Sequence, residues 1–280
     1  MRTELLGVVE ILSGDGSLVT VYPTKERGDA TRFAASLKEN EYDKIVVCGG
    51  DGTLNEVITG LMTADLHYTL GYIPSGTLNE WSSGLRISRS IKQAAADITT
   101  GKKVMLDIGK FGDKYFSYTA SFGAFTDASY SAPQDVKNVL GQAAYFFEGI
   151  KSLGNIKPVH LKFTADGREE EGDFLFGAVS NSMSVGGIVK FDETVVKLND
   201  GKFEILLIRN PDNILKLQPV IDGILKKDLD RQGIEFFTAE SITVTGGDGL
   251  SWTLDGEYAR GEDTVEIKNL HNAIELIVPQ

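Results

Sequence analysis

Two short glycine-rich stretches that share one pattern are the first candidates for chemistry. Gly52-Thr53-Leu54-Asn55-Glu56 recurs as Gly76-Thr77-Leu78-Asn79-Glu80, and the first copy is preceded by Gly49-Gly50-Asp51. Glycines allow the backbone to approach a phosphate without side-chain obstruction. Thr53 could cap a following helix, whose free amides attract anions. Asp51 would repel a phosphate unless a divalent cation lay between them, so the pattern predicts a site for a phosphorylated ligand and a metal ion.

The same glycines would also suit ordinary tight turns between a strand and a helix. Short glycine motifs often occur by chance. Two copies after apolar strands nevertheless favour a ligand site, because ligands of open α/β sheets bind at the carboxyl ends of the strands. The stretch matches neither the dinucleotide-binding fingerprint nor the P-loop, since no Lys-Ser/Thr pair follows the glycines.

A second set of carboxylates lies near the C-terminus. Asp255 and Glu257 flank a glycine, so on a strand both side chains would point to one face. Phosphoryl transfer needs an acceptor for the proton of the attacking hydroxyl, and a carboxylate can be that acceptor. Taken alone, Asp255-Gly256-Glu257 is more typical of a hairpin turn, and Asp200-Gly201 is by itself a good turn as well.

The elements that must position these residues change in character near residue 107. Before it, short apolar runs alternate with helical patterns, which indicates a parallel sheet covered on both faces. We expect strands at residues 18–22, 44–48 and 69–73, and helices at residues 3–13, 29–40 and 53–62. This part of the chain, residues 1–107, is predicted to be an α/β domain.

Residues 108–280 contain many short strand candidates interrupted by two helical patterns. The expected strands are 115–121, 159–164, 174–179, 203–208, 242–245, 251–254, 264–267 and 273–278, and the expected helices are 135–153 and 214–229. Strands this dense, separated by turn sequences, are typical of a β-sandwich or barrel. We therefore predict a second domain of β-sandwich type over residues 108–280.

The composition excludes several functions. A formal net charge of −12 argues against nonspecific binding of nucleic acid, which requires an excess of basic side chains. The single cysteine, Cys48, excludes an intramolecular disulfide and a zinc site built from cysteines. The N-terminus does not have the pattern of a signal peptide, and no run of 18 apolar residues occurs, so we expect a cytoplasmic protein.

The order of the motifs resembles one known family. Residues 46–60, VVCGGDGTLNEVITG, look like the signature of the diacylglycerol kinase catalytic-domain family, which includes sphingosine kinases and bacterial lipid kinases. Residues 73–80 are similar to the second glycine loop of that family, and residues 21–30 to its second strand and the helix that follows. Leu106-Asp107-Ile108-Gly109 and Leu254-Asp255-Gly256-Glu257 match two further blocks, so the resemblance extends through nearly the whole chain.

The resemblance implies an ATP-dependent lipid kinase that uses magnesium and phosphorylates diacylglycerol or a related lipid alcohol. It implies an N-terminal domain like that of NAD kinase and phosphofructokinase, a C-terminal β-sandwich, and a nucleotide between them. By motif position, ATP would be held by Thr24, Gly49, Gly50, Asp51, Gly52, Thr53, Asn55, Glu56, Gly76 and Thr77. The active-site magnesium network would contain Asp51, Glu80 and Asp107, and the general base would be Asp255 or Glu257. A structural magnesium would bind Asp200 and the backbone oxygens of Lys197 and Lys202.

Two departures from the family pattern qualify this expectation. The first expected helix begins at residue 3. The strand that precedes it in the family, with its Asn-Pro-x-Ser-Gly loop, is therefore expected to be missing from this chain. Glu80 stands where the family usually has aspartate. An NAD kinase-like enzyme and a non-catalytic protein that binds lipid or nucleotide remain the alternatives. We expect a peripheral, transient association with membranes, and exposed sheet edges would favour a homodimer.

Overall fold

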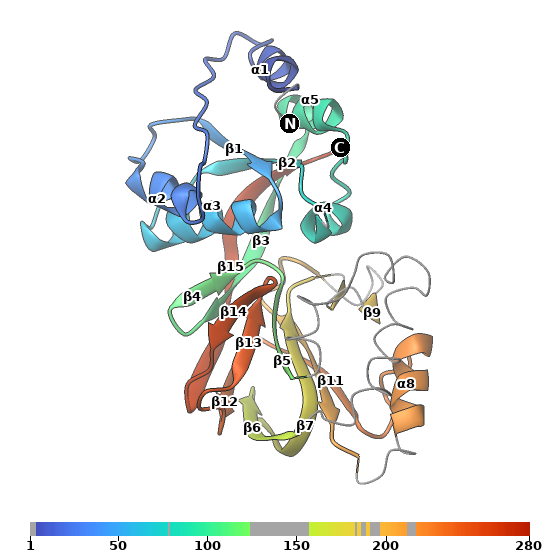
Figure 1. The fold of residues 1–280 in the computed structure, drawn as a ribbon. Coiled ribbons are helices and arrows are strands. Elements are labelled where there is room, and N and C mark those ends of the chain that lie inside the picture. Colours follow the sequence, from blue (N-terminus) through green and yellow to red (C-terminus); the bar gives the residue numbers. More distant parts are fainter. Residues whose placement is uncertain are drawn as a thin grey trace. The chain divides into compact units, whose positions relative to one another are not determined.

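The computed structural model describes residues 4–77, 79–123, 157–182, 184–185, 189–190, 197–211 and 217–280 (Figure 1). The helix expected at residues 135–153 lies outside these ranges. The chain forms two compact units, one made of Met1–Ile108 with Asn272–Gln280 and the other of Gly109–His271. None of the described helices is long and apolar enough to cross a membrane.

The first unit contains the predicted α/β architecture. β1 pairs in parallel with β2, and β2 pairs in parallel with the end of β15. Its helices are α1 (Leu5–Leu12), α2 (Asp29–Ser36), α3 (Asp51–Thr63), α4 (Glu80–Gly84) and α5 (Ile91–Thr100). Its strands are β1 (Lys44–Gly49), β2 (Thr69–Pro74), most of β3 (Lys102–Phe111) and the end of β15 (Thr264–Val278). Residues 272–280, which we expected in the second domain, lie here because Glu275 and Leu276 pair with β2.

Small residues allow the helices of this unit to pack closely. A Cβ on Gly60 of α3 would lie 2.5 Å from the carbonyl oxygen of Thr31, so α3 and α2 are in contact along this side (Figure 1). A Cβ on Gly71 of β2 would lie 2.9 Å from Ile98 of α5. The first contact holds α3 against α2, and the second holds α5 against β2; the first residue of α3, Asp51, follows the end of β1 closely.

The expected strand at residues 18–22 does not form, so that prediction is wrong. The segment forms no strand pairing in the described structure, and Leu18 is 99% exposed. An apolar run becomes a strand only when a neighbouring strand takes up its hydrogen bonds. Within the described residues β1 lies at the edge of its sheet and pairs with β2 alone, so this segment does not pair with it.

The second unit is an antiparallel, β-sandwich-like domain, as predicted. From β15 the strand order runs through β12, β6, β7, β5, β13 and β14, and β10 pairs with both β7 and β11. The bounds are β4 (Lys114–Phe116), β5 (Thr119–Gly123), β6 (Val159–Ala165), β7 (Arg168–Ser180), β8 (Ser184–Val185), β9 (Val189–Lys190), β10 (Phe203–Arg209), α8 (Leu217–Lys226), β11 (Ile234–Ala239), β12 (Ser241–Thr245), β13 (Ser251–Leu254) and β14 (Glu257–Arg260).

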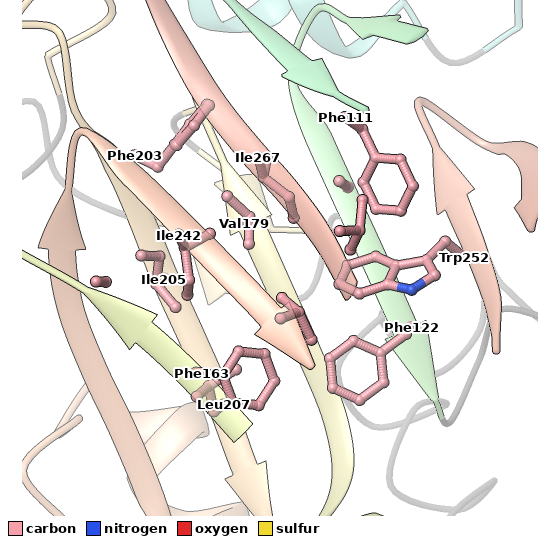
Figure 2. Close-up of a cluster of buried hydrophobic side chains, with 14 of the residues drawn as sticks. Phe111, Phe122, Phe163, Val179, Phe203, Ile205, Leu207, Ile242, Trp252 and Ile267 are labelled. Carbon is pink, nitrogen blue, oxygen red and sulfur yellow. The ribbon is translucent and has the colours of Figure 1, made fainter. Parts of the chain in front are cut away.

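The main core of this unit is a cluster of aromatic and aliphatic side chains (Figure 2). The ring of Phe122 lies 4.9 Å from that of Trp252 and 6.0 Å from that of Phe163, measured between centroids. Strand alternation decides which side chains enter the core. On β10, for example, Phe203, Ile205 and Leu207 belong to it, and the residues between them therefore point to the opposite face.

Candidate active site

The two glycine-rich loops lie against each other in the first unit. A Cβ on Gly76 would lie 2.6 Å from the Cα of Gly50, and the Ser75 N–H donates a hydrogen bond of 2.8 Å to the carbonyl oxygen of Gly49. Each loop follows one of two adjacent parallel strands, β1 and β2, so the pairing of the strands brings the loops together. Neither loop could carry a side chain at the point of contact without moving.

Helix α3 begins within the first glycine-rich loop. Gly50 is its N-cap residue and the helix has no side-chain cap, so the cap expected from Thr53 is not formed. The Thr53 side chain packs against Gly49, because a Cβ added to Gly49 would lie 2.6 Å from it. No atom lies within 4 Å of a Cβ built on Gly52, so packing does not require glycine there. The helix dipole favours an anion at this end, and Gly52 leaves the approach open.

Asp51, Tyr72 and Asn79 form a small polar network beside these loops. The Tyr72 hydroxyl lies 3.3 Å from Asp51 Oδ1 and 3.4 Å from Asn79 Oδ1, and it can donate to one of them at a time. Burial, followed by the charge of Asp51, raises the pKa of Tyr72, so the phenol keeps its proton. Asn79 in turn holds Gly76, accepting its N–H at 3.0 Å and donating to its carbonyl oxygen at 2.7 Å.

Neither Tyr72 nor Asn79 was among the predicted site residues. The available signal for Tyr72 was a phenol hydroxyl inside the apolar run LGYI of β2. Tyr72 is only 1% exposed, so its hydroxyl needs a partner within the protein. Asp51, which follows the adjacent strand β1, is within reach.

The other predicted nucleotide-binding residues have mixed surroundings. Glu56 accepts the N–H of Gly28 at 2.9 Å and that of Ala30 at 3.2 Å, so its carboxylate holds the start of α2. Asn55 is half-buried on α3, and Thr24 and Thr77 are exposed. The structure therefore gives Glu56 a structural contact, and the roles of all four residues toward ATP stay predictions.

The carboxylates predicted to surround a magnesium ion differ in accessibility. Asp51 is half-buried at the start of α3, whereas Asp107 on β3 is fully buried and accepts the N–H of Asn272 at 2.7 Å. Glu80 is the first residue of α4, and its side chain lies outside the described atoms. Within the described part of the chain, no three His, Cys, Asp or Glu side chains gather as metal ligands would. Asp51 has the oxygen chemistry that Mg²⁺ prefers, and the network stays a prediction.

The predicted structural magnesium site is a tight turn before β10. Asp200 Oδ1 accepts the N–H of Lys202 at 3.1 Å, and Gly201 has a φ of 77°, which favours glycine. Asp200, Lys197 and Lys202 are exposed. One carboxylate oxygen and nearby backbone oxygens suit a hard cation, and the assignment stays a prediction.

Asp255 lies in a turn and not on a strand. Asp255 and Gly256, with φ of 49° and 86°, form the two-residue connection between β13 and β14, and Leu254 pairs with Glu257 across it. The expectation that Asp255 and Glu257 lie on one strand and point to one face is therefore wrong, and the hairpin interpretation is right, with Glu257 the first residue of β14. Positive φ at both turn residues is what a type I′ hairpin requires, and Asp-Gly supplies it.

The Asp255 carboxylate is held by backbone donors from a distant part of the chain. It is 7% exposed and accepts the N–H groups of Ser117, of Tyr118 at 3.0 Å and of Thr119 at 2.9 Å. The Asp255 N–H also donates to the Thr119 carbonyl oxygen at 2.9 Å. These bonds immobilise the carboxylate, while Glu257 is half-buried on β14. A fixed carboxylate can accept a proton from a bound hydroxyl.

Cys48, at the end of β1 beside the first glycine loop, gives a test of burial at this site. Burial raises the pKa of its thiol to about 11. We expect iodoacetamide to modify the native protein slowly at neutral pH, because only the thiolate reacts. As the pH is raised toward that pKa, the rate should increase roughly tenfold for each pH unit. Protein unfolded in urea should react faster at the same pH, as its thiol titrates normally. Equal rates for the two states would contradict the burial of Cys48.

Comparison with known proteins gives one consistent result over the whole chain. Residues 1–111 match the diacylglycerol kinase catalytic domain, and residues 120–278 match the YegS C-terminal NAD kinase beta sandwich-like domain. The chain is 31% identical to the diacylglycerol kinase of Bacillus subtilis (strain 168) over 280 residues, covering 100% of this chain and 92% of that protein. It is 30% identical to that of Staphylococcus aureus (strain Newman), covering 99% and 88%.

A solved structure agrees with these matches. The crystal structure of a diacylglycerol kinase from Bacillus anthracis str. Sterne superposes on this chain with a TM-score of 0.79 and 27% sequence identity. The superposition covers 99% of this chain and 91% of the other. The fold is therefore shared over both units, including the strands that carry the two glycine loops and the Asp255 turn.

Proposed function

The chain belongs to the family of the diacylglycerol kinase catalytic domain, and on this premise we propose that it transfers the γ-phosphoryl group of ATP to the hydroxyl of diacylglycerol or a related lipid alcohol. One observation carries the proposal: the two glycine loops meet beside the open N-terminus of α3. A surface made of glycine backbone and helix amides suits a polyphosphate. Relatives named diacylglycerol kinase, similar over the full chain, support a kinase.

The first unit would bind the nucleotide. The backbone N–H groups at the start of α3, with Gly50 and Gly52 free of side chains, would receive phosphate oxygens. Asp51 would hold magnesium, with Glu80 and Asp107 completing the acidic surroundings, and the Tyr72 hydroxyl would orient the Asp51 carboxylate. Magnesium, when bound, neutralises the phosphate charge that develops during transfer.

The second unit would supply the acceptor of the proton. The carboxylate of Asp255, fixed by three backbone N–H groups, would accept the proton of the lipid hydroxyl as it attacks the phosphoryl group. Glu257 is the other candidate for this role. Because the substrate is a lipid, we propose that the protein reaches it by transient docking at a membrane surface.

An assay with two acceptors tests the function. The purified chain is incubated with Mg-ATP and either diacylglycerol in mixed micelles or NAD, and the phosphorylated products are separated. We expect phosphorylated lipid and unchanged NAD, and we expect Asp51→Ala to lose both activity and the rise in melting temperature that Mg-ATP produces in the wild type. Phosphorylated NAD with inert lipid would establish the NAD kinase alternative. If Mg-ATP did not shift the melting temperature and Asp51→Ala had no effect, the protein would be a non-catalytic binder.

A further inference from the structure

One buried hydroxyl lies between the two glycine-rich loops. It belongs to Tyr72 of β2, which is only 1% exposed. A Cβ on the preceding residue, Gly71, would lie 2.9 Å from Ile98 of α5, and the side chains of successive strand residues point to opposite faces. The Tyr72 side chain therefore points away from α5, and its hydroxyl reaches Asp51, the first residue of α3.

This hydroxyl has two acceptors and a single proton. Its oxygen lies 3.3 Å from Asp51 Oδ1 and 3.4 Å from Asn79 Oδ1. Rotation about the C–O bond can direct the proton to either oxygen, but not to both at once. The two distances are nearly equal, and both exceed the about 2.8 Å that is usual for an O–H···O bond. The hydroxyl is therefore an element with two positions, and its acceptors decide between them.

The charge of Asp51 favours the first position in the free protein. A hydrogen bond to a carboxylate is roughly twice as strong as one to a neutral carbonyl group. A cation at Asp51 would reverse the preference, because it compensates the charge of the carboxylate and repels the positive end of the O–H dipole. Asn79 Oδ1 can then accept the hydroxyl, since an amide oxygen has two lone pairs and the Gly76 N–H uses one of them. The state of Asp51 therefore sets the direction of the Tyr72 hydroxyl.

Asn79 is the residue through which this change would reach the second loop. Its side chain holds Gly76 by two hydrogen bonds, accepting the N–H at 3.0 Å and donating to the carbonyl oxygen at 2.7 Å. Its own carbonyl oxygen accepts the Ser82 hydroxyl of α4 at 2.8 Å. With a φ of 51°, Asn79 has a left-handed backbone, which residues other than glycine adopt mainly where neighbouring contacts hold them. A further hydrogen bond to Oδ1 would therefore make the second loop more rigid.

We propose that Tyr72 is a positioning residue that links the two glycine-rich loops: its hydroxyl donates to Asp51 while the site is empty, and it turns to Asn79 when a cation engages Asp51, which tightens the second loop. This inference rests on the proposed function and adds regulation to the same site, because engagement of Asp51 would prepare the second loop for the phosphates. The two-position hydroxyl is the physical element that both loops bias.

Hydrogen exchange of the second loop tests the link in protein without nucleotide, metal or substrate. Exchange of the backbone N–H groups of residues 75–79 is followed by mass spectrometry in the wild type, Asp51→Ala, Tyr72→Phe and the double variant. Asp51→Ala removes the preferred acceptor, so the hydroxyl must turn to Asn79. We expect exchange of the loop to slow about fivefold, the effect of one hydrogen bond. In the Tyr72→Phe background the same substitution should leave the exchange rate unchanged.

Tyr68→Phe is the matched control, since it also removes a buried phenol hydroxyl, just before β2. The Tyr68 hydroxyl accepts the Glu41 N–H at 3.1 Å and donates to the carbonyl oxygen of Lys38, contacts that involve neither glycine-rich loop. This variant should have a lower melting temperature than the wild type, yet Asp51→Ala should slow the loop in this background as it does in the wild type. Asp51→Asn, which keeps the size of the side chain and weakens the acceptor, takes the place of Asp51→Ala if that variant does not fold.

Two results of the exchange experiment would overturn the proposal. If the Asp51 substitution slowed the loop equally with tyrosine and with phenylalanine at position 72, the effect would not pass through the hydroxyl. If it did not slow the loop in the wild type, the hydroxyl would not turn to Asn79, and Tyr72 would only fill the space beside Asp51.

A binding measurement distinguishes failure of this inference from failure of the proposed function. The dissociation constant for ADP is determined by calorimetry at saturating magnesium and in EDTA. We expect Tyr72→Phe to weaken binding about fivefold with magnesium and to leave it unchanged without, because only engagement of Asp51 tightens the loop. Equal weakening in both conditions would mean a structural role and refute the link, even in an active kinase. The expected pattern in a protein that phosphorylates no lipid would refute the kinase assignment and keep the link.

Discussion

Replacing Asp255 by asparagine is expected to lower kcat by about 10²- to 10⁴-fold, the usual contribution of a general base. The asparagine amide has nearly the same shape but cannot accept a proton at neutral pH. Its NH₂ group would also face one of the backbone N–H groups that Asp255 now receives from Ser117, Tyr118 and Thr119. We therefore expect some loss of stability together with the loss of turnover, and little change in the KM for ATP.

Asp255→Ala separates the structural contribution of the carboxylate from its chemical one. The variant leaves three N–H groups without their acceptor, and one unsatisfied buried group costs about 1–3 kcal/mol, so we expect a free energy of unfolding lower by about 3 kcal/mol or more. Urea denaturation measures it. Glu257→Gln is the matched control for the base, because Glu257 is half-buried and lies across the same turn. If Glu257→Gln abolished turnover and Asp255→Asn did not, Glu257 would be the base.

Gly76→Ala should separate the two glycine loops and abolish ATP binding. The added Cβ would lie 2.6 Å from the Cα of Gly50 and 2.8 Å from Asn79 Oδ1, and the backbone atom cannot move aside cheaply. Overpacking of this kind costs about 1–3 kcal/mol of stability. Displacement of the loop by about 1 Å can reduce catalysis about 10²-fold. We expect a lower melting temperature, no stabilisation by Mg-ATP and a comparable loss of kcat/KM.

Gly52→Ala is the control for the preceding variant. No atom lies within 4 Å of its added Cβ, and the position is in the first turn of α3, so the stability should stay unchanged or rise by up to about 1 kcal/mol. Weaker ATP binding by this variant, without loss of stability, would mean that the nucleotide approaches the backbone at Gly52. Normal stabilisation by Mg-ATP in Gly76→Ala would contradict the placement of the nucleotide at these loops.

Much of the local structure was readable from the sequence because it depends on near neighbours. The apolar run at residues 44–48 is a strand followed closely by a helix, and Asp255-Gly256 forms the hairpin that its composition favours. The repeated glycine motif predicted a ligand site where parallel strands end, and the structure brings the two loops together at that edge of the sheet. The division into α/β and β-sandwich parts followed from the change in periodicity near residue 107.

The tertiary structure decided features that depend on residues far apart in sequence. Residues 18–22 have the composition of a strand, but they pair with no strand of the described chain. The expected strands at 264–267 and 273–278 are one strand, β15, because its two ends pair with β12 and with β2. The polar residues between them resemble a turn in sequence, and Asn272 among them has a φ of 51°, yet the pairing of the two ends makes them part of one strand.

The same distinction applies to the candidate site. The sequence by itself determined which residues carry the chemistry: glycines, Asp51 and Asp255. It could not place Asp255 under the N–H of Ser117, 138 residues away, or Tyr72 beside Asp51. Hydrogen-bond partners and burial are set by which strands become neighbours, and this depends on the packing of the whole chain.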